Sequence, residues 1–245
     1  MTRVLVLGGT AEARELARLL HEDDRFEVLS SLAGRVANPR LPVGETRIGG
    51  FGGPSGLAEL LEDFDVLVDA THPFAATISR NAAEAAQRAG VPLLALVRPP
   101  WSRAPGDRWT VVPTVPAAAA ELAERAPARV LLTTGRQDVG EFAALGDHWF
   151  LVRVVDAPSG PLPRRHVLLR DRGPYTPESE RTLLRENAID VLVTKNSGGD
   201  LVSAKLAAAR ELGLEVIVVD RPSRPDGVPT VPTAAEVYAR LVAGL

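Results

Sequence analysis

The stretch Val4-Leu-Val-Leu-Gly-Gly-Thr-Ala-Glu-Ala13 decides the fold of this chain. Its first four residues form a continuous apolar run, which is typical of a strand buried on both faces of a parallel sheet. After the glycine pair, apolar residues recur at helical spacing as far as Leu20, so the glycines lie where a strand turns into a helix. Such a turn points backbone N–H groups and the positive end of the helix at one place, which suits a phosphate.

The turn is a variant of the dinucleotide-binding fingerprint G-x-G-x-x-G/A. It keeps two adjacent glycines and ends in the small residue Ala13. We therefore predict that a dinucleotide cofactor contacts the residues of this turn, namely Gly8, Gly9, Thr10, Ala11 and Glu12. The alternative is a tight strand-to-helix turn that holds no ligand.

The second predicted strand, residues 27–32, lacks the acidic end that holds the ribose hydroxyls in NAD-binding domains. It ends in Ser30 and Ser31, and Arg35 follows shortly after. Hydroxyls and a guanidinium suit the 2′-phosphate of NADP, so Ser31 and Arg35 are its predicted ligands. A lone arginine is also common as a solvated surface charge.

Two further loops are predicted to reach the cofactor. The glycines of Gly49-Gly-Phe-Gly-Gly53 let backbone approach a ligand, and the predicted contacts are Gly50, Phe51 and Gly52; a flexible loop tip is the alternative. The loop after the predicted strand 65–69 supplies Thr71, His72, Pro73 and Phe74 at the carboxyl edge of the sheet. His72 could act as acid or base or fix the cofactor amide, and a helix-end hydrogen bond is the alternative.

The composition limits the possible classes of protein. The chain has 245 residues, a formal net charge of -3 and no cysteine. Lack of cysteine excludes disulfides, thiolate catalysis and iron–sulfur clusters, and without paired histidines we expect no metal site. The acidic balance argues against a nucleic-acid partner. We expect no membrane span and no signal peptide, because the first strand begins at residue 3, and hence a cytoplasmic protein.

The sequence contains two copies of one pattern. Four segments, residues 3–9, 65–68, 90–99 and 112–116, recur in the same order as residues 129–135, 190–193, 213–222 and 228–232. Strands and helices alternate in each copy. The pattern predicts an α/β chain of two tandem Rossmann-like domains, each a doubly wound parallel sheet, with a ligand cleft between them. We expect an NADP(H)-binding domain at residues 1–115 and a substrate-side domain at residues 116–245, with the boundary between 99 and 127.

The second copy carries candidate ligands for an anionic substrate. The segment 195–199 offers a cation, an amide, a hydroxyl and N–H groups at a predicted helix start; a helix capped by Asn196 or Ser197 is the alternative. Arginines at strand ends, Arg98 included, suit a polycarboxylate, and each could equally be a solvated charge. Tyr175 could stack on a flat ligand or cover the core. The candidate substrate ligands are Arg136, Arg172, Tyr175, Lys195, Asn196, Ser197, Gly198 and Gly199.

Several enzyme classes lack their motifs in this chain. Neither Tyr175 nor Tyr238 is followed by a lysine four residues later, so the acid–base pair of short-chain dehydrogenases is missing. The sequence also lacks the Gly-x-Ser-x-Gly elbow of hydrolases and the Gly-x-x-x-x-Gly-Lys-Ser/Thr loop of P-loop NTPases.

The motifs together resemble the precorrin-6A reductases of corrin-ring biosynthesis, essentially from end to end. The matching segments are Gly8-Gly-Thr-x-Glu-Ala-Arg14, Gly49-Gly-Phe-Gly52, Asp69-Ala-Thr-His-Pro-Phe-Ala75, Ile78-Ser-Arg80, Thr134-Gly-Arg136, Arg172-Gly-Pro174 and Lys195-Asn-Ser-Gly-Gly199. The Thr-His-Pro and Lys-Asn-Ser-Gly-Gly segments are far more specific than the glycine turn.

The resemblance implies an oxidoreductase that acts on a CH–CH bond. Hydride from NADPH, or from NADH in the cobalt-dependent branch, would reduce one ring double bond of precorrin-6A to give precorrin-6B in the cobalamin pathway. The substrate is then a large anionic tetrapyrrole, with handover to other enzymes of the pathway. His72 and Lys195 would position the reactants, and no proton donor is identified. An NADP-sensing regulatory module is the non-enzymatic alternative.

Overall fold

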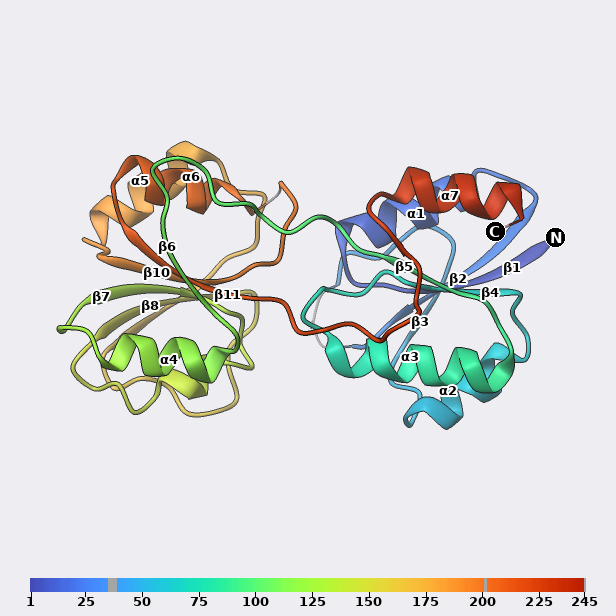
Figure 1. Cartoon of the computed structure of the whole chain (residues 1–245), viewed down its shortest axis with the longest axis horizontal. Coiled ribbons are helices and arrows are strands. Elements are labelled where there is room, and N and C mark those ends of the chain that lie inside the picture. Colours follow the sequence, from blue (N-terminus) through green and yellow to red (C-terminus); the bar gives the residue numbers. More distant parts are fainter. Residues whose placement is uncertain (35–38, 201, 245) are drawn as a thin grey trace. The chain divides into compact units, whose positions relative to one another are not determined.

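The computed structural model describes residues 1–34, 39–200 and 202–244 and divides the chain into two compact units (Figure 1). Unit 1 comprises Met1–Pro99 and Ser223–Leu245, and unit 2 comprises Pro100–Pro222. Each unit contains a six-stranded parallel sheet with helices on both faces, which confirms the predicted pair of Rossmann-like folds.

Unit 1 is built around strand β1. Its elements are β1 (Thr2–Leu7), α1 (Ala11–His21), β2 (Phe26–Leu32), β3 (Glu45–Ile48), α2 (Pro54–Leu61), β4 (Val66–Asp69), α3 (Ala76–Ala89), β5 (Leu93–Leu96), β12 (Thr230–Val231) and α7 (Ala234–Ala243). The strand order is β12-β5-β4-β1-β2-β3. Val4, Leu5 and Val6 are fully buried, as their apolar run predicts. The chain leaves β1 toward β2 on one side and returns to β4 on the other, so the ends of β1 and β4 flank the switch point where such sheets bind ligands.

Unit 2 repeats this topology. Its elements are β6 (Arg108–Val112), α4 (Val115–Ala123), β7 (Arg129–Thr133), the 3₁₀ helix η1 (Val139–Phe142), β8 (Trp149–Val154), β9 (His166–Arg170), α5 (Pro177–Glu186), β10 (Val191–Lys195), α6 (Ala204–Glu211) and β11 (Glu215–Val219). The strand order is β6-β11-β10-β7-β8-β9. The central strand β7 is followed by η1 and not by an α-helix, so unit 2 lacks the strand-to-helix turn of unit 1.

The two sequence copies exchange their last strand and helix. By sequence, β6 and α4 close the first copy, but β6 pairs with β11 in unit 2. Likewise β12 and α7 close the second copy, but β12 pairs with β5 in unit 1. The observed units therefore differ from the predicted domains 1–115 and 116–245. The reason is that repeat order along a chain does not determine which sheet edge a terminal strand joins.

The exchanged segments also correct the last sequence match. Val112 and Val231 each end a strand, and the threonine two residues later caps the next helix. The hydroxyl of Thr114 accepts from the Ala117 N–H group at 3.2 Å, and that of Thr233 accepts from the Glu236 N–H group at 3.2 Å. The equivalent segments are therefore 112–114 and 231–233, three residues away from the predicted alignment.

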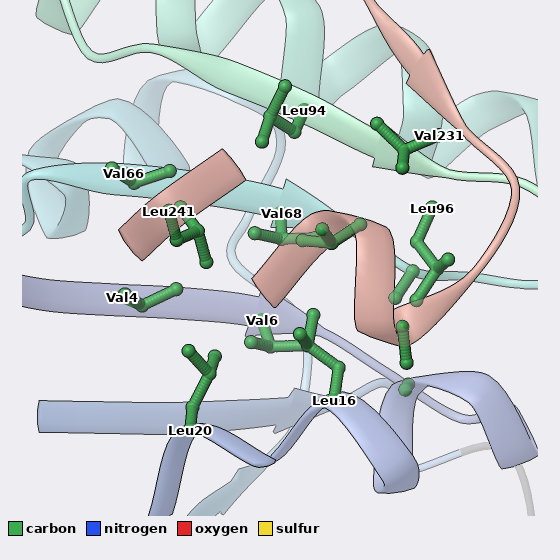
Figure 2. Packing of buried hydrophobic residues seen from close by; sticks show 14 of the residues in the cluster. Val4, Val6, Leu16, Leu20, Val66, Val68, Leu94, Leu96, Val231 and Leu241 are labelled. Carbon is green, nitrogen blue, oxygen red and sulfur yellow. The ribbon is translucent and has the colours of Figure 1, made fainter. Parts of the chain in front are cut away.

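The exchanged segment completes the core of unit 1. Val231 and Leu241 lie among buried side chains of β1, α1, β4 and β5 (Figure 2). Val237 of the same segment is fully buried. Full burial of a valine or leucine side chain contributes about 1.5–3 kcal/mol. Unit 1 therefore depends on residues that follow unit 2 in the sequence.

Candidate functional site

The glycine turn leaves its backbone open to a ligand. The N–H group of Gly8 donates to the Ser31 carbonyl at 2.9 Å, which fixes the turn against the end of β2. Gly9 has φ of +115°, and a Cβ atom added there would meet nothing within 4 Å. A hollow adjoins this turn, lined by Gly8, Gly9, Ala13, Arg14, Ser30, Leu32 and Pro42. The arrangement fits the close backbone approach that a diphosphate requires.

Thr10 fixes the start of α1. Its hydroxyl accepts from the Ala13 N–H group at 3.0 Å and donates to the carbonyl of Ala70 at 2.9 Å. This buried side chain therefore joins the first turn of α1 to the end of β4. Ala11 and Glu12 begin the helix, where backbone N–H groups have no acceptor within the helix.

Glu12 places a carboxylate beside this positive helix end. Arg98, which follows β5, donates to that carboxylate at 2.8 Å, and both side chains are largely buried. The pair balances the negative charge of Glu12. Arg98 thus forms an ion pair within unit 1, whereas the sequence analysis names it as a candidate ligand for a polycarboxylate.

Two buried hydroxyls on β2 and β3 have no hydrogen-bond partner within the described part of the chain. They belong to Ser30 and Thr46, which are register neighbours on β2 and β3. Ser30 also lines the hollow at the glycine turn and is 2% exposed. A buried hydroxyl without a partner costs about 1–3 kcal/mol. A ribose or phosphate oxygen would satisfy Ser30, so the residues present fit a nucleotide.

Asp69 organises the loop that follows β4. Its buried carboxylate accepts from the N–H and hydroxyl of Thr71, at 3.1 and 2.6 Å. It also accepts from the Ser79 hydroxyl at 2.6 Å and from Arg224 at 2.8 Å. Thr71 is therefore held at the switch point by a residue that the sequence reasoning did not select. The sequence feature that could have identified Asp69 is its position as a carboxylate at the end of an apolar strand.

His72 lies inside this loop and not at the cap of α3. Its Nδ1 accepts from the Phe74 N–H group at 3.2 Å, and the two ring centroids are 5.9 Å apart. Ala75 precedes the first residue of α3. An accepting Nδ1 leaves the proton of a neutral imidazole on Nε2, which makes His72 a possible donor to a ligand. Pro73 lies between these two residues in the sequence, within a turn.

In the glycine loop after β3, the aromatic ring of Phe51 packs against the guanidinium of Arg47. Arg47 lies over Phe51, with 4.3 Å from Cζ to the ring centroid. It also donates to the Gly50 carbonyl and to the Ser31 hydroxyl, each at 3.3 Å. Gly52 has φ of +76°, which favours glycine. The structure thus adds Arg47 to predicted Ser31, whereas Arg35 lies outside the described residues and its role stays a prediction.

The predicted helix start at residues 195–199 is wrong. Helix α6 begins at Ala204, and Ser203 precedes it, so neither Asn196 nor Ser197 caps it. The Asn196 amide bonds the backbone of Trp101, accepting at 2.8 Å and donating at 3.3 Å. Local sequence favoured a helix here, but the loop continues because its polar groups bond other segments.

Donors from outside this loop occupy its carbonyl groups. Arg221 donates to the carbonyls of Asn196 and Ser197, at 2.9 and 3.0 Å. The indole of Trp101 donates to the Gly199 carbonyl at 2.9 Å. Gly198 and Gly199 have φ of +67° and +77°, so both glycines are needed for the backbone path.

Lys195 forms an ion pair with Asp138, which follows β7. Arg136 lies in the same loop after β7, with its guanidinium 4.0 Å from the Asp156 carboxylate. Arg172 lies in the loop between β9 and α5. Three of the cations predicted for a polycarboxylate, Arg136, Arg172 and Lys195, therefore lie at or after the carboxyl ends of strands in unit 2, where carboxylates of the chain already neutralise two of them.

Tyr175 covers a buried ion pair. The guanidinium of Arg153 lies 4.1 Å from the Tyr175 ring centroid and donates to Glu180 at 3.0 Å. Arg153 and Glu180 are 6% and 1% exposed. Burial raises the pKa of the Tyr175 phenol. These contacts support its role in covering the core, and stacking on a flat ligand stays a prediction.

Within residues 1–34, 39–200 and 202–244, no group of three or more His, Asp or Glu side chains is placed to hold a metal ion. No helix in that part of the chain has the length and apolar character needed to cross a membrane.

Known proteins match this chain along nearly its whole length. The family model described as precorrin-6x reductase CbiJ/CobK matches residues 3–241. A precorrin-6A reductase from Rhodococcus erythropolis is 52% identical over 98% of this chain and 97% of that protein. A solved structure of CobK precorrin-6A reductase is 46% identical, covers 99% of this chain and 97% of its own, and superposes with a TM-score of 0.92. A cobalt-precorrin-6A reductase from Priestia megaterium is 30% identical over 89% of this chain and 90% of that protein.

Proposed function

Because this chain belongs to the precorrin-6x reductase family, we propose that it reduces one ring double bond of precorrin-6A to give precorrin-6B, with NADPH as the hydride donor. The observation that carries the proposal is the match of sequence and fold over nearly the whole chain. The segments of this sequence that resemble the family include the glycine turn and the Thr-His-Pro and Lys-Asn-Ser-Gly-Gly segments.

The local geometry of unit 1 supports a nicotinamide cofactor there. When bound, NADPH supplies a hydride, and the protein supplies binding, orientation and charge. Backbone N–H groups at Gly9, Ala11 and Glu12 would bind the diphosphate, and the hydroxyl of Ser30 would gain a partner. The Nε2–H group of His72 would bind the cofactor amide and so orient the nicotinamide.

Unit 2 supplies the cations for an anionic tetrapyrrole in this proposal. Arg136, Arg172 and Lys195 would bind carboxylates of the ring substituents, and the substrate would compete with Asp138 for Lys195. The segment 196–199 would contribute N–H groups. The cleft predicted between the two domains, handover to other enzymes of the pathway and a cytoplasmic location remain predictions.

The comparisons favour the metal-free substrate over its cobalt form. The relative named precorrin-6A reductase is 52% identical, and the one named cobalt-precorrin-6A reductase is 30% identical. A purely regulatory NADP sensor receives no support, because these relatives are named as reductases.

An anaerobic assay with purified protein tests the proposal. We expect loss of NADPH absorbance only when precorrin-6A is present, with formation of a product two hydrogen atoms heavier by mass spectrometry. NADH and cobalt-precorrin-6A replace the two reactants in parallel samples and should support slower turnover. Binding of NADPH without oxidation in the presence of precorrin-6A would contradict the reductase and favour the sensor.

A further inference from the structure

Arg47, on β3, lies beside the end of β2, the strand end at which dinucleotide-binding domains hold the ribose. It pairs in parallel register with Ser31 near the carboxyl end of β2. In NAD-binding domains an acidic side chain at the end of this strand holds the 2′-hydroxyl, whereas an arginine accommodates the 2′-phosphate of NADP. Here β2 ends in Ser31 and Leu32, so no carboxylate of this strand end would repel a phosphate.

The partners of Arg47 are neutral. Its guanidinium donates to the hydroxyl of Ser31 and the carbonyl of Gly50, both at the long distance of 3.3 Å. Among the described residues it forms no ion pair, whereas Arg98 in the same unit pairs with Glu12. The half-buried positive charge of Arg47 is therefore not neutralised by a carboxylate of the described chain.

The guanidinium is also held in position. Its Cζ lies over the Phe51 ring, 4.3 Å from the centroid, and the two long hydrogen bonds restrict its rotation. A planar guanidinium has five N–H donors, so donors remain for a phosphate after these two bonds. The Ser31 hydroxyl, 5% exposed, adds one more donor beside them.

We propose that Arg47, together with the hydroxyl of Ser31, binds the 2′-phosphate of NADPH and thereby selects NADPH over NADH. Phe51 is a positioning residue that holds the guanidinium flat. The inference rests on the proposed function, since it concerns the cofactor of that reaction. It assigns to Arg47 the selectivity for NADPH that the sequence analysis assigns to Arg35.

Calorimetric titration of the full chain tests the proposal without turnover. The probes are NADP⁺, NAD⁺ and 2′,5′-ADP, which carries the phosphate but no nicotinamide. We expect Arg47→Ala to weaken NADP⁺ and 2′,5′-ADP by about 10- to 100-fold while NAD⁺ changes by less than about threefold. Ser31→Ala should show a smaller loss with the same selectivity. Arg240→Ala, which removes an exposed arginine on α7, is the charge-matched control and should change none of the three.

Two further variants separate the possible explanations. Arg47→Lys keeps the charge but not the planar fork, so it should lose part of the selectivity and serves if Arg47→Ala does not fold. Equal losses for NAD⁺ and NADP⁺ in both Arg47 variants would mean a purely structural role and would overturn the inference. If Arg35→Ala selectively lost affinity for NADP⁺ and Arg47→Ala did not, the 2′-phosphate would be assigned to Arg35, and the inference would be overturned.

The wild-type protein distinguishes failure of the inference from failure of the proposed function. If it binds NAD⁺ and NADP⁺ equally well and reduces precorrin-6A with either reduced cofactor, only the selectivity of Arg47 is refuted. If it binds neither dinucleotide and does not oxidise NADPH with precorrin-6A, the proposed function fails and the inference fails with it.

Discussion

The guanidinium of Arg224 lies 2.8 Å from the carboxylate of Asp69, although 155 residues separate them in sequence. Asp69 ends β4 at the switch point, and Arg224 is the second residue of the segment that returns to unit 1 after unit 2. The side chains are 1% and 22% exposed. The same carboxylate also holds Thr71, so the returning segment and the loop of His72 share one anchor.

Replacing Arg224 should loosen the returning segment. Arg224→Ala leaves the buried carboxylate of Asp69 with only its hydroxyl and N–H donors, so we expect the free energy of opening to fall by about 1–3 kcal/mol. Hydrogen exchange measured by mass spectrometry should then speed up in β12 and α7, with little change in unit 2. Arg240→Ala removes an exposed charge from the same segment and is the control. Unchanged exchange in the Arg224 variant would show that hydrophobic packing alone holds the segment.

Removing the returning segment should unfold unit 1 selectively. A chain that ends at Pro222 lacks Val231, Val237 and Leu241, which complete the core of unit 1. The loss of three buried side chains at about 1.5–3 kcal/mol each is comparable to the stability of a small domain.

Tryptophan fluorescence can distinguish the two units in this truncated chain. The three tryptophans of the protein, Trp101, Trp109 and Trp149, all lie in unit 2. We expect native-like tryptophan emission together with reduced far-UV circular dichroism and rapid hydrogen exchange in β1. Slow exchange in β1 would refute the dependence of unit 1 on the segment. Loss of the native emission as well would mean that unit 2 also depends on it.

The fold was predictable because its signals are local. The apolar runs of β1, β4, β7 and β10 and the helical spacing after the glycine turn are read within a few residues of each other. The exchange of β6 and β12 was not predictable in this way. Each strand could extend either sheet, and the choice depends on packing of α7 against α1 and on pairing with a distant strand.

Gly9→Ala should weaken both oxidised dinucleotides equally. A Cβ atom would project into the open space beside the turn, and the φ of +115° disfavours any other residue. We expect about a 10-fold or larger loss in affinity for NAD⁺ and NADP⁺ by calorimetry, with a stability cost of about 1–2 kcal/mol. This equal loss differs from the result expected for Arg47→Ala, which should weaken NADP⁺ much more than NAD⁺. A loss of affinity confined to NADP⁺ would contradict the prediction that the diphosphate binds at this turn.

The candidate site was only partly predictable for the same physical reason. The glycine turn and the Thr71 loop follow strands whose sequence identifies them. Asp69, Arg47 and Asp138 were missed because their importance depends on partners brought close by the fold. Asp138 lies 57 residues from Lys195 in the sequence, yet it neutralises the lysine.

The stability of unit 2 should fall in acid through His148. Burial lowers the pKa of this imidazole below its ordinary value of 6.5. Its Nδ1 accepts from the Ala128 N–H group at 3.1 Å, and a protonated Nδ1 could not accept that bond. As the pH falls below the ordinary pKa, the unfolded state binds a proton that the folded state does not. The contribution of His148 to stability is therefore full above that pH and lost below it.

Urea unfolding followed by tryptophan fluorescence measures this dependence, because Trp149 is the next residue in unit 2. We expect the wild-type free energy of unfolding to be lower at about pH 5.5 than at about pH 7.5. His148→Gln should be less stable at both pH values but should lose less on acidification, since its amide does not titrate. His21→Gln, an exposed histidine of unit 1, should leave the wild-type dependence unchanged. An identical pH dependence in His148→Gln and wild type would show that other groups, and not His148, cause the loss of stability in acid.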